Sequence, residues 1–313
     1  MNVKRLTDNK IILITRSTRL EELLTRFNTI GQAKFWIEHM GADFSDYETE
    51  HSRYKAALKE AEQQLHLAGR LQIVDRGFLP NFVFGEEDTV VVLGQDGLVA
   101  NTMKYLNTQP VLGVNPDPGR WDGVLLPFLV GDLSTVVLEV FAKRRKVREI
   151  TMAKAKLNNG QTLYGINDLF IGQKSHVSAR YQISIGKREE RHSSSGVIVS
   201  TGLGSTGWFK SVLAGARGLG AALGQSLDTG IFNDFGWESD YLYYCVREPF
   251  PSKATQAGLV FGKIAPDAPL DLISLMPEHG VIFSDGMETD FLEFTSGTQA
   301  TIAPADKKGH LVV

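Results

Sequence analysis

The sequence predicts a two-domain protein, with an α/β N-terminal domain built on a parallel sheet and a mostly antiparallel β C-terminal domain. The chain has 313 residues, which suggests two domains at roughly 150 residues per domain. Strand-like apolar runs alternate with helical patterns in the first half, as in parallel α/β sheets. Short strands separated by turn signals fill the second half, which is typical of antiparallel sheets.

In the first half, apolar runs without alternation predict strands that are buried on both faces, at residues 11–15, 89–93 and 111–114. Apolar residues at helical spacing lie around these runs. They predict helices at residues 20–27, 32–39, 48–66 and 133–142. Asp132 is placed to be the N-cap of the last of these helices.

The pattern changes near residues 144–148, which predicts domains at 1–145 and 146–313 and leaves open a return of the last strand to the first domain. Asn158-Asn159-Gly160 follows an apolar stretch and predicts a hairpin turn, because Asn-Gly accepts positive φ. Alternation at residues 180–185 predicts a half-buried strand. Further strands are predicted at 259–261, 272–275, 281–283 and 300–302, and one helix at 209–223.

Composition narrows the class of protein. There are 33 Lys and Arg against 36 Asp and Glu, a net charge of −3, which argues against nucleic acid as the main partner. Cys245 is the one cysteine, so an intramolecular disulfide is excluded, and we expect it to be a packed strand residue rather than a nucleophile. No apolar run approaches the roughly 18 residues of a membrane span, and no targeting segment is evident, so we expect a soluble, cytoplasmic protein.

The first candidate site is Gly94-Gln95-Asp96-Gly97, which joins a buried strand to residues that can open a helix. Ligands of open α/β sheets bind at the carboxyl ends of strands, and glycines there let backbone N–H groups approach a phosphate. The Asp96 carboxylate fits a base that accepts the proton of an attacking hydroxyl, or a partner of Mg²⁺ beside a phosphoryl group. An ordinary turn with Asp96 as helix N-cap explains the same residues.

The second candidate site is Thr201-Gly202-Leu203-Gly204-Ser205-Thr206-Gly207-Trp208, again between a strand and a helix. Glycines interleaved with hydroxyls ahead of a helix suit backbone contacts to a phosphate-bearing ligand. A turn capped by Ser or Thr, with Trp208 in the core, is the alternative. One such loop in each half favours a nucleotide site formed by both domains.

These segments resemble the NAD kinase family. That family carries Gly-Gly-Asp-Gly where this chain has Gly94-Gln95-Asp96-Gly97, and Asn-Glu where it has Asn167-Asp168. Its Ser-Thr-Pro-Thr-Gly-Ser-Thr-Ala-Tyr segment corresponds to residues 200–208, and its late Asp-Gly to Asp285-Gly286. The mitochondrial-type branch is the most similar, through Gly113-Val114-Asn115-Pro116-Asp117-Pro118, Ser194-Ser195-Gly196 and Val246-Arg247-Glu248-Pro249. The resemblance runs from about residue 10 to residue 303.

The resemblance implies an ATP-dependent kinase with its active site in the cleft between an α/β and a β domain. The γ-phosphoryl group of ATP would move to the adenosine ribose 2′-hydroxyl of NAD, with Mg²⁺ neutralising the phosphates. Asp96 would be the base. The implied nucleotide-binding residues are Gly94, Gln95, Gly97, Asn167, Asp168, Ser195, Gly204, Ser205, Thr206, Gly207, Trp208 and Ser211. ATP and NAD would be the partners, no protein metal site is implied, and a homodimer is expected.

Departures from the family pattern keep two alternatives open. Gln95 replaces a glycine, which would cost about 1 kcal/mol if that position needs positive φ. Asp168 is one methylene shorter than Glu, and Gly202 and Leu203 replace Pro and Thr. The same fold could therefore phosphorylate another hydroxyl compound, such as a sugar or lipid. It could also belong to a nucleotide-binding regulator without catalysis.

Overall fold

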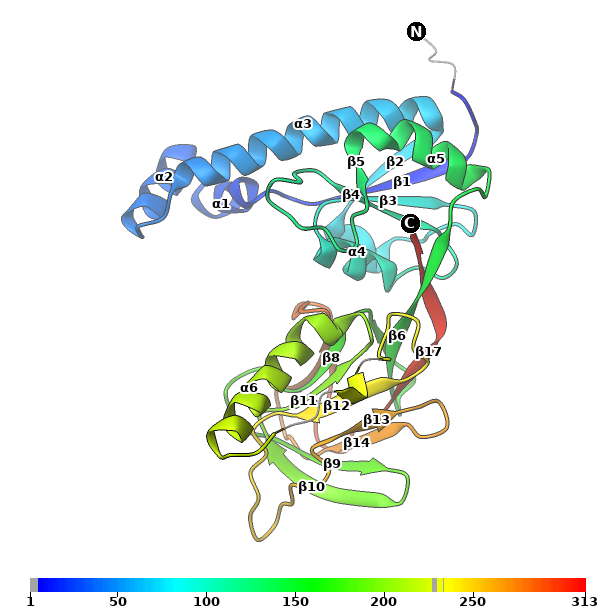
Figure 1. Ribbon diagram of the computed structural model, residues 1–313. Coiled ribbons are helices and arrows are strands. Elements are labelled where there is room, and N and C mark those ends of the chain that lie inside the picture. Colours follow the sequence, from blue (N-terminus) through cyan, green and yellow to red (C-terminus); the bar gives the residue numbers. More distant parts are fainter. Residues whose placement is uncertain (1–4, 227–229, 233) are drawn as a thin grey trace. The chain divides into compact units, whose positions relative to one another are not determined.

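The computed structural model describes residues 5–226, 230–232 and 234–313, and the chain divides into two compact units (Figure 1). Unit 1 comprises Met1–Arg148 together with His310–Val313, and unit 2 comprises Glu149–Gly309. The C-terminal residues therefore belong to the same unit as the N-terminal half. Within the described ranges, no helix is long and apolar enough to cross a membrane.

Unit 1 is built on a parallel sheet with the strand order β4-β3-β1-β2, as the sequence predicts. Its strands are β1 (Lys10–Thr15), β2 (Arg70–Asp75), β3 (Thr89–Leu93), β4 (Val111–Asn115) and the short β5 (Phe128–Leu129). The side chains of β3 and β4 are all buried, which explains their unbroken apolar sequences. β5 pairs with the carboxyl end of β4, and Leu311 pairs in parallel with Val111 at its amino end.

Helices cover both faces of this sheet (Figure 1). They are α1 (Arg19–Phe27), α2 (Ile30–His39), α3 (Phe44–Ala68), α4 (Asp96–Met103) and α5 (Leu133–Phe141). In α3, Tyr54, Ala61 and Leu65 are buried at helical spacing and pack with α5 on one face, whereas α4 lies on the other. Asp132 is the N-cap residue of α5, as predicted, but its side chain makes no cap hydrogen bond to the helix. Its carboxylate accepts from the Leu129 N–H at 2.8 Å and so closes the turn before α5.

Unit 2 consists of two sheets with antiparallel pairing, which confirms the predicted class of the second half. One sheet contains β6 (Val147–Leu157), β7 (Thr162–Gly165), β9 (Ala179–Ile185), β10 (Arg188–Ser194), β14 (Leu270–Ser274) and β17 (Gln299–Val312). The other has the order β13-β12-β11-β8-β15-β16, from β8 (Asp168–Gln173), β11 (Val197–Ser200), β12 (Leu242–Val246), β13 (Phe261–Ile264), β15 (Gly280–Ser284) and β16 (Phe291–Glu293). Gly160 has φ +89° in the predicted hairpin turn.

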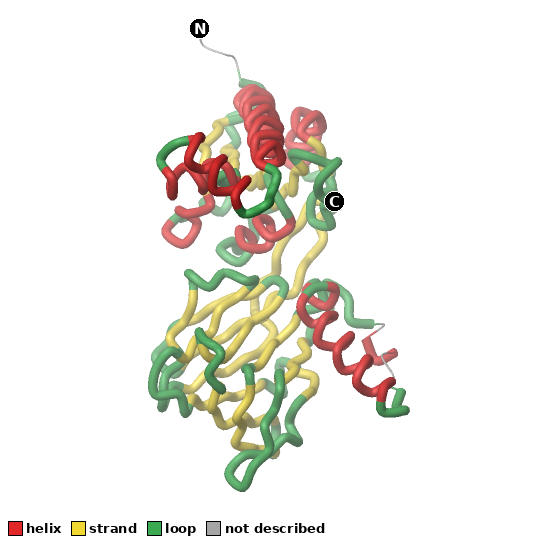
Figure 2. Tube along the Cα trace, turned by 90° about the vertical axis from the view of Figure 1, so that its left-hand side faces the viewer, coloured by secondary structure: helices red, strands yellow, loops and turns green. Residues whose placement is uncertain are grey.

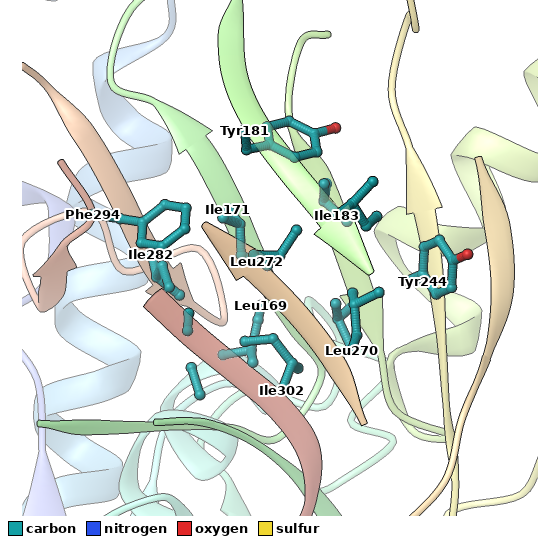
Figure 3. Close-up of a cluster of buried hydrophobic side chains, with 14 of the residues drawn as sticks. Leu169, Ile171, Tyr181, Ile183, Tyr244, Leu270, Leu272, Ile282, Phe294 and Ile302 are labelled. Carbon is teal, nitrogen blue, oxygen red and sulfur yellow. The ribbon is translucent and has the colours of Figure 1, made fainter. Parts of the chain in front are cut away.

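Apolar side chains from both sheets form the core of unit 2 (Figure 3). Leu169, Ile171 and Ile282 come from β8 and β15, and they lie with Tyr181, Ile183, Leu270, Leu272 and Ile302 of the other sheet. The helix α6 (Trp208–Ala222) is the one α-helix in the described part of unit 2, and it lies outside the sheets (Figure 2). It confirms the helix predicted at residues 209–223.

Two strand predictions need new bounds, and two strands were missed. The strand predicted at 259–261 begins at Phe261, because the Leu259 N–H donates to the Glu190 carboxylate at 2.9 Å instead of to a strand. The strand predicted at 300–302 runs over Gln299–Val312. The strands β2 and β10 were not predicted: β10 begins with four charged residues, Arg188–Arg191, and β2 is an exposed edge strand, so neither has an apolar run.

Candidate functional site

The first glycine loop lies at the carboxyl end of β3, where it enters α4. Gln95 is the N-cap of α4 and has φ −115°, an extended conformation that any residue adopts, so the penalty considered for Gln95 does not arise. A Cβ on Gly94 would lie 2.7 Å from Leu98 Cδ2, so a side chain at this position would require the end of the Leu98 side chain to move. A Cβ on Gly97 would meet nothing within 4 Å, and Gly97 is exposed, so its backbone is open to a ligand.

The Asp96 carboxylate is held from outside its own loop. Asp96 Oδ1 accepts a hydrogen bond from the Leu125 N–H at 2.6 Å, and the side chain is only partly exposed. The reading of Asp96 as helix N-cap is therefore wrong, because Gln95 has that place and Asp96 is the first residue of α4. Among the residues that the structure describes, no donor contacts Oδ2 of Asp96. The carboxylate thus has one fixed oxygen and one oxygen available for chemistry.

In unit 2, the second glycine loop packs against the segment that carries Asn167 and Asp168. Thr201 Oγ1 donates to the Ile166 carbonyl at 2.6 Å, and the Thr201 N–H donates to the Asn167 carbonyl at 3.0 Å. A Cβ on Gly204 would lie 1.9 Å from the Asn167 carbonyl oxygen, so only glycine allows this approach. The structure therefore brings these two predicted segments together.

The hydroxyls of the second loop have structural partners. Ser205 Oγ donates to the Gly202 carbonyl at 2.7 Å, and Thr206 Oγ1 donates to the Leu203 carbonyl at 3.4 Å. The N-cap of α6 is Gly207, which provides no side-chain cap. The alternative reading is correct for the turn itself, because Thr201 Oγ1 accepts from the Gly204 N–H at 3.1 Å, but no Ser or Thr side chain caps α6. Trp208, partly exposed, is not a core residue, and Phe209 is buried in its place.

The partly buried Asp285 carboxylate holds the backbone that carries Asn167 and Asp168. Asp285 lies in the β15–β16 turn with φ +53°, and its carboxylate accepts from the N–H groups of Ile166 at 3.0 Å and Asn167 at 2.6 Å. Asp168 is only 7% exposed. Burial, together with the charge of Asp285, raises the pKa of the Asp168 carboxyl to about 7. Asp168 therefore changes its charge near neutral pH.

A pocket of about 480 Å³ lies in unit 2 beside the second loop. Three aromatic rings form its wall: Trp208 stacks on Phe170 with ring centres 5.7 Å apart, and Phe170 contacts Phe283 at 4.9 Å. The Arg247 guanidinium lies 5.5 Å from the centre of the Trp208 ring, and Lys174 also lines the pocket. An aromatic wall with cations beside it suits a flat ring that carries phosphate.

The predicted residues differ in their relation to this pocket. Ser195 and Trp208 line it, whereas Ser211 is exposed and lines only an apolar groove of about 840 Å³ beside α6, which shares Trp208 and Arg247 with the pocket. The sequence reasoning did not assign site roles to Phe170, Arg247 or Leu125. Arg247 occurs in a segment that carries the family resemblance, and Phe170 lies two residues after Asp168 of another, so that resemblance was the available signal for them. The Leu125 contribution is a backbone N–H, for which a sequence gives no signal.

Two further features concern chemistry at the site. Among the described residues, no three His, Cys, Asp or Glu side chains form a group that could hold a metal ion. Burial, with a smaller effect of the Glu248 charge, raises the pKa of the Cys245 thiol to about 11. The thiol is therefore protonated at neutral pH, as expected of a packed strand residue rather than a nucleophile.

Comparison with known structures identifies the class of fold. No protein-family model matches the sequence, and a search of curated proteins gives no match. Solved structures of NAD kinases do match over nearly the whole chain. The chain therefore has the fold of the NAD kinase family, which the sequence motifs resemble.

Two of these structures illustrate the similarity. Yeast NADH kinase, solved in complex with NADH, has 16% sequence identity and a TM-score of 0.58, over 98% of this chain and 84% of that chain. An NAD kinase from Archaeoglobus fulgidus, solved in complex with ATP, has 14% identity and a TM-score of 0.55, over 97% of this chain and 93% of that chain. At these identities the similarity concerns the fold.

Proposed function

We propose that the protein is an NAD kinase-like phosphotransferase that moves the γ-phosphoryl group of ATP to the adenosine ribose 2′-hydroxyl of NAD, giving NADP. The observation that carries this proposal is the Asp96 carboxylate, which is fixed through one oxygen at the carboxyl end of β3. In an α/β sheet this is the edge where ligands bind. The motif resemblance and the shared fold support the same reaction.

In this mechanism Asp96 is the general base. The 2′-hydroxyl of NAD loses its proton to Asp96 Oδ2 as its oxygen forms a bond to the γ-phosphorus of ATP. The bond from that phosphorus to the β–γ bridging oxygen breaks, and ADP leaves with that electron pair. Such transfers are accelerated chiefly by positioning and by charge stabilisation. Mg²⁺ enters bound to the ATP phosphates, as part of that substrate.

The remaining site residues bind rather than react. Gln95 and Gly97 bring backbone N–H groups of the α4 N-terminus toward phosphates, whereas the Gly94 N–H already donates to the Val114 carbonyl at 3.2 Å and Gly94 shapes the turn. Asn167 and Asp168 bind ribose or base groups of a nucleotide. The other proposed nucleotide-binding residues are Ser195, Gly204, Ser205, Thr206, Gly207, Trp208 and Ser211, among which Trp208 offers its ring to a base. A mitochondrial-type specificity, a homodimer and a cytoplasmic location are parts of the same proposal.

The direct test is incubation of the purified protein with ATP, Mg²⁺ and NAD, followed by an enzymatic assay for NADP. The proposal predicts NADP that increases with time and with enzyme concentration. Absence of NADP at micromolar enzyme, with a protein shown to be folded, would remove it. NADH and polyphosphate in separate reactions define the acceptor and the donor.

A second candidate is a kinase of the same fold that phosphorylates a different hydroxyl compound. The observation in its favour is Asp168, which is buried beside Asp285 and is shorter than the Glu of the family pattern. A thermal-shift panel separates the two candidates, because a ligand that binds the folded state raises Tm. Stabilisation by NAD or NADP supports the first candidate, and stabilisation by a sugar or lipid headgroup alone supports the second.

A further inference from the structure

We infer that the loop of residues 116–126, after β4, is a positioning device for the Asp96 carboxylate. This inference rests on the proposed function for its catalytic meaning, while its structural part concerns unit 1 alone. The loop is distant from Asp96 in sequence, but it supplies the Leu125 N–H that holds Asp96 Oδ1 at 2.6 Å. Charge-assisted hydrogen bonds of this length are strong and directional, so the loop fixes where the carboxylate points.

The loop lies against β4 because of a single glycine. A Cβ on Gly113 would lie 1.8 Å from the Leu125 carbonyl oxygen, and no side chain tolerates that distance. Gly113 is therefore the residue that lets Leu125 come close to the sheet. Gly123 then turns the chain toward Leu125 with φ +68°, a conformation that favours glycine.

Asn115, the last residue of β4, braces the loop from within. Its side-chain Oδ1 accepts from the Asp117 N–H at 3.0 Å, and its Nδ2 donates to the Trp121 carbonyl at 3.0 Å. Asn115 is 5% exposed, so these bonds are shielded from water. One amide thus fixes both ends of the turn that precedes Leu125.

Ion pairs then anchor the loop to α3. The Asp117 carboxylate is largely buried and accepts from Arg53 Nη1 at 3.0 Å, and Arg120 lies 3.7 Å from it. Arg120 also donates to Asp46 at the start of α3. The hydrogen bonds from Arg120 and Arg19 hold the pKa of the Asp46 carboxyl well below its ordinary value, so this anchor stays charged at neutral pH.

The arrangement explains why the segment from Gly113 to Asp117 is built from these residue types. Gly113 admits the loop, Asn115 braces it and Asp117 anchors it, while none of their side chains donates to Asp96. They act through the Leu125 N–H and are positioning residues. A carboxylate displaced by about 1 Å loses on the order of 10²-fold in rate, so the loop should set kcat more than substrate binding.

The test compares two loop variants with a matched glycine control. Gly113→Ala forces Leu125 away from β4, and Asp117→Asn weakens the anchor. Gly119→Ala is the control, because its Cβ would be 3.7 Å from the nearest atom, Asp117 Oδ1. We expect kcat for NADP formation to fall about 10- to 100-fold in the first two variants, with KM for NAD little changed. Gly119→Ala should keep both constants.

Non-additivity tests the route through Asp96. In an Asp96→Ala background, Gly113→Ala and Asp117→Asn should lower residual activity no further, because residues that act through one group are not additive. Normal kcat in both folded loop variants would overturn the inference. If Gly113→Ala does not fold, Asp117→Asn, judged by its far-UV circular dichroism, carries the test.

Amide hydrogen exchange at Leu125 separates this inference from the proposed function. Exchange should be slow in the unmodified protein and faster in Asp96→Ala and in Gly113→Ala, since each loses the acceptor or the contact. That result supports the positioning loop even if no NADP forms. Equal exchange rates in all three proteins would overturn the inference, whatever the enzyme assay shows.

Discussion

The β3–α4 loop of unit 1 and the β11–α6 loop of unit 2 each join a buried strand to a helix through glycines, but their side chains are used differently. In the first, Asp96 accepts one N–H from another loop and keeps a second oxygen available. In the second, Thr201 and Ser205 donate to backbone carbonyls close by. The first loop is thus arranged around the Asp96 side chain, and the second around the conformation of its own backbone.

The glycines of the two loops differ in the space that surrounds them. Gly202 and Gly204 are needed for packing, because a Cβ would lie 1.7 Å and 1.9 Å from backbone carbonyl oxygens. Gly97 of the first loop has no such neighbour. Packing does not explain the glycine at an open position, so the approach of a ligand can explain it. Close contact with a carbonyl oxygen by itself explains the glycine at a packed position. Substitutions in these two loops, and at Asp168 beside the second loop, test this contrast.

The largest effect is expected from Asp96→Asn. If Asp96 is the base, NADP formation falls about 10³-fold, a typical contribution of general base catalysis, while Tm changes little. Asp122→Asn is the matched control, since Asp122 is an exposed residue of the neighbouring loop. Activity of Asp96→Asn within a fewfold of that of the unmodified protein would contradict the catalytic role of Asp96. The side chains of the two loops would then not differ in function.

The next effect concerns Asp168 and the pH dependence of stability. Its pKa of about 7 in the folded state exceeds the ordinary value, so the folded state binds the proton more tightly than the unfolded state. The contribution of Asp168 to the free energy of unfolding is therefore complete below about pH 4 and is lost as the pH rises through 7.

Asp168→Asn should abolish this loss of stability at high pH, because an amide does not ionise. The variant should match the unmodified protein at pH 4 and exceed it at pH 8, by at most about 4 kcal/mol at 1.36 kcal/mol per pKa unit. Chemical denaturation at both pH values measures the difference. Asp267→Asn, at an exposed turn, is the control and should show no such change. A variant that is less stable at pH 8 would show that Asp168 is held ionised.

Gly204→Ala tests the steric role of the second loop. The added methyl group meets the Asn167 carbonyl, and we expect a loss of about 3 kcal/mol in the free energy of unfolding. Gly215→Ala in α6 has open space and should instead stabilise the protein by about 1 kcal/mol. Urea denaturation of both variants decides, and equal stabilities would contradict the close approach.

Gly97→Ala should have the smallest effect on stability and is the most selective probe of a ligand. Because its site is open and helical, alanine should leave stability unchanged or raise it by less than about 1 kcal/mol. If phosphates approach this backbone, KM for ATP rises severalfold at the same time. An unchanged KM for ATP would show that the phosphates do not bind at the Gly97 backbone.

Much of the fold could be predicted from the sequence, because buried strands such as residues 89–93 and the amphipathic helix around Tyr54 carry their periodicity locally. The strand β10 could not, since it begins with four consecutive charged residues, has no apolar run and is fixed by pairing with β9. The position of Leu259 was missed for a related reason: its partner is a carboxylate 69 residues away.

The candidate site likewise contains features with a local sequence signal and features that depend on distant contacts. Asp96 and the two glycine loops could be found from the local sequence, because their residue types predict a strand-to-helix turn. The partner of Asp96 is a backbone N–H, and the distortion expected at Gln95 is absent because φ there is −115°. Contacts to backbone atoms do not depend on the residue type that supplies them, so they cannot be predicted from one sequence.

The most direct test of the account is a crystal structure of the protein with NAD and a non-hydrolysable ATP analogue. The account predicts the adenosine ribose 2′-oxygen within about 3 Å of Asp96 Oδ2, the reach of a general base. Asp96 Oδ1 should remain on the Leu125 N–H. A bound NAD whose ribose hydroxyls contact other residues, with Asp96 turned to solvent, would contradict it.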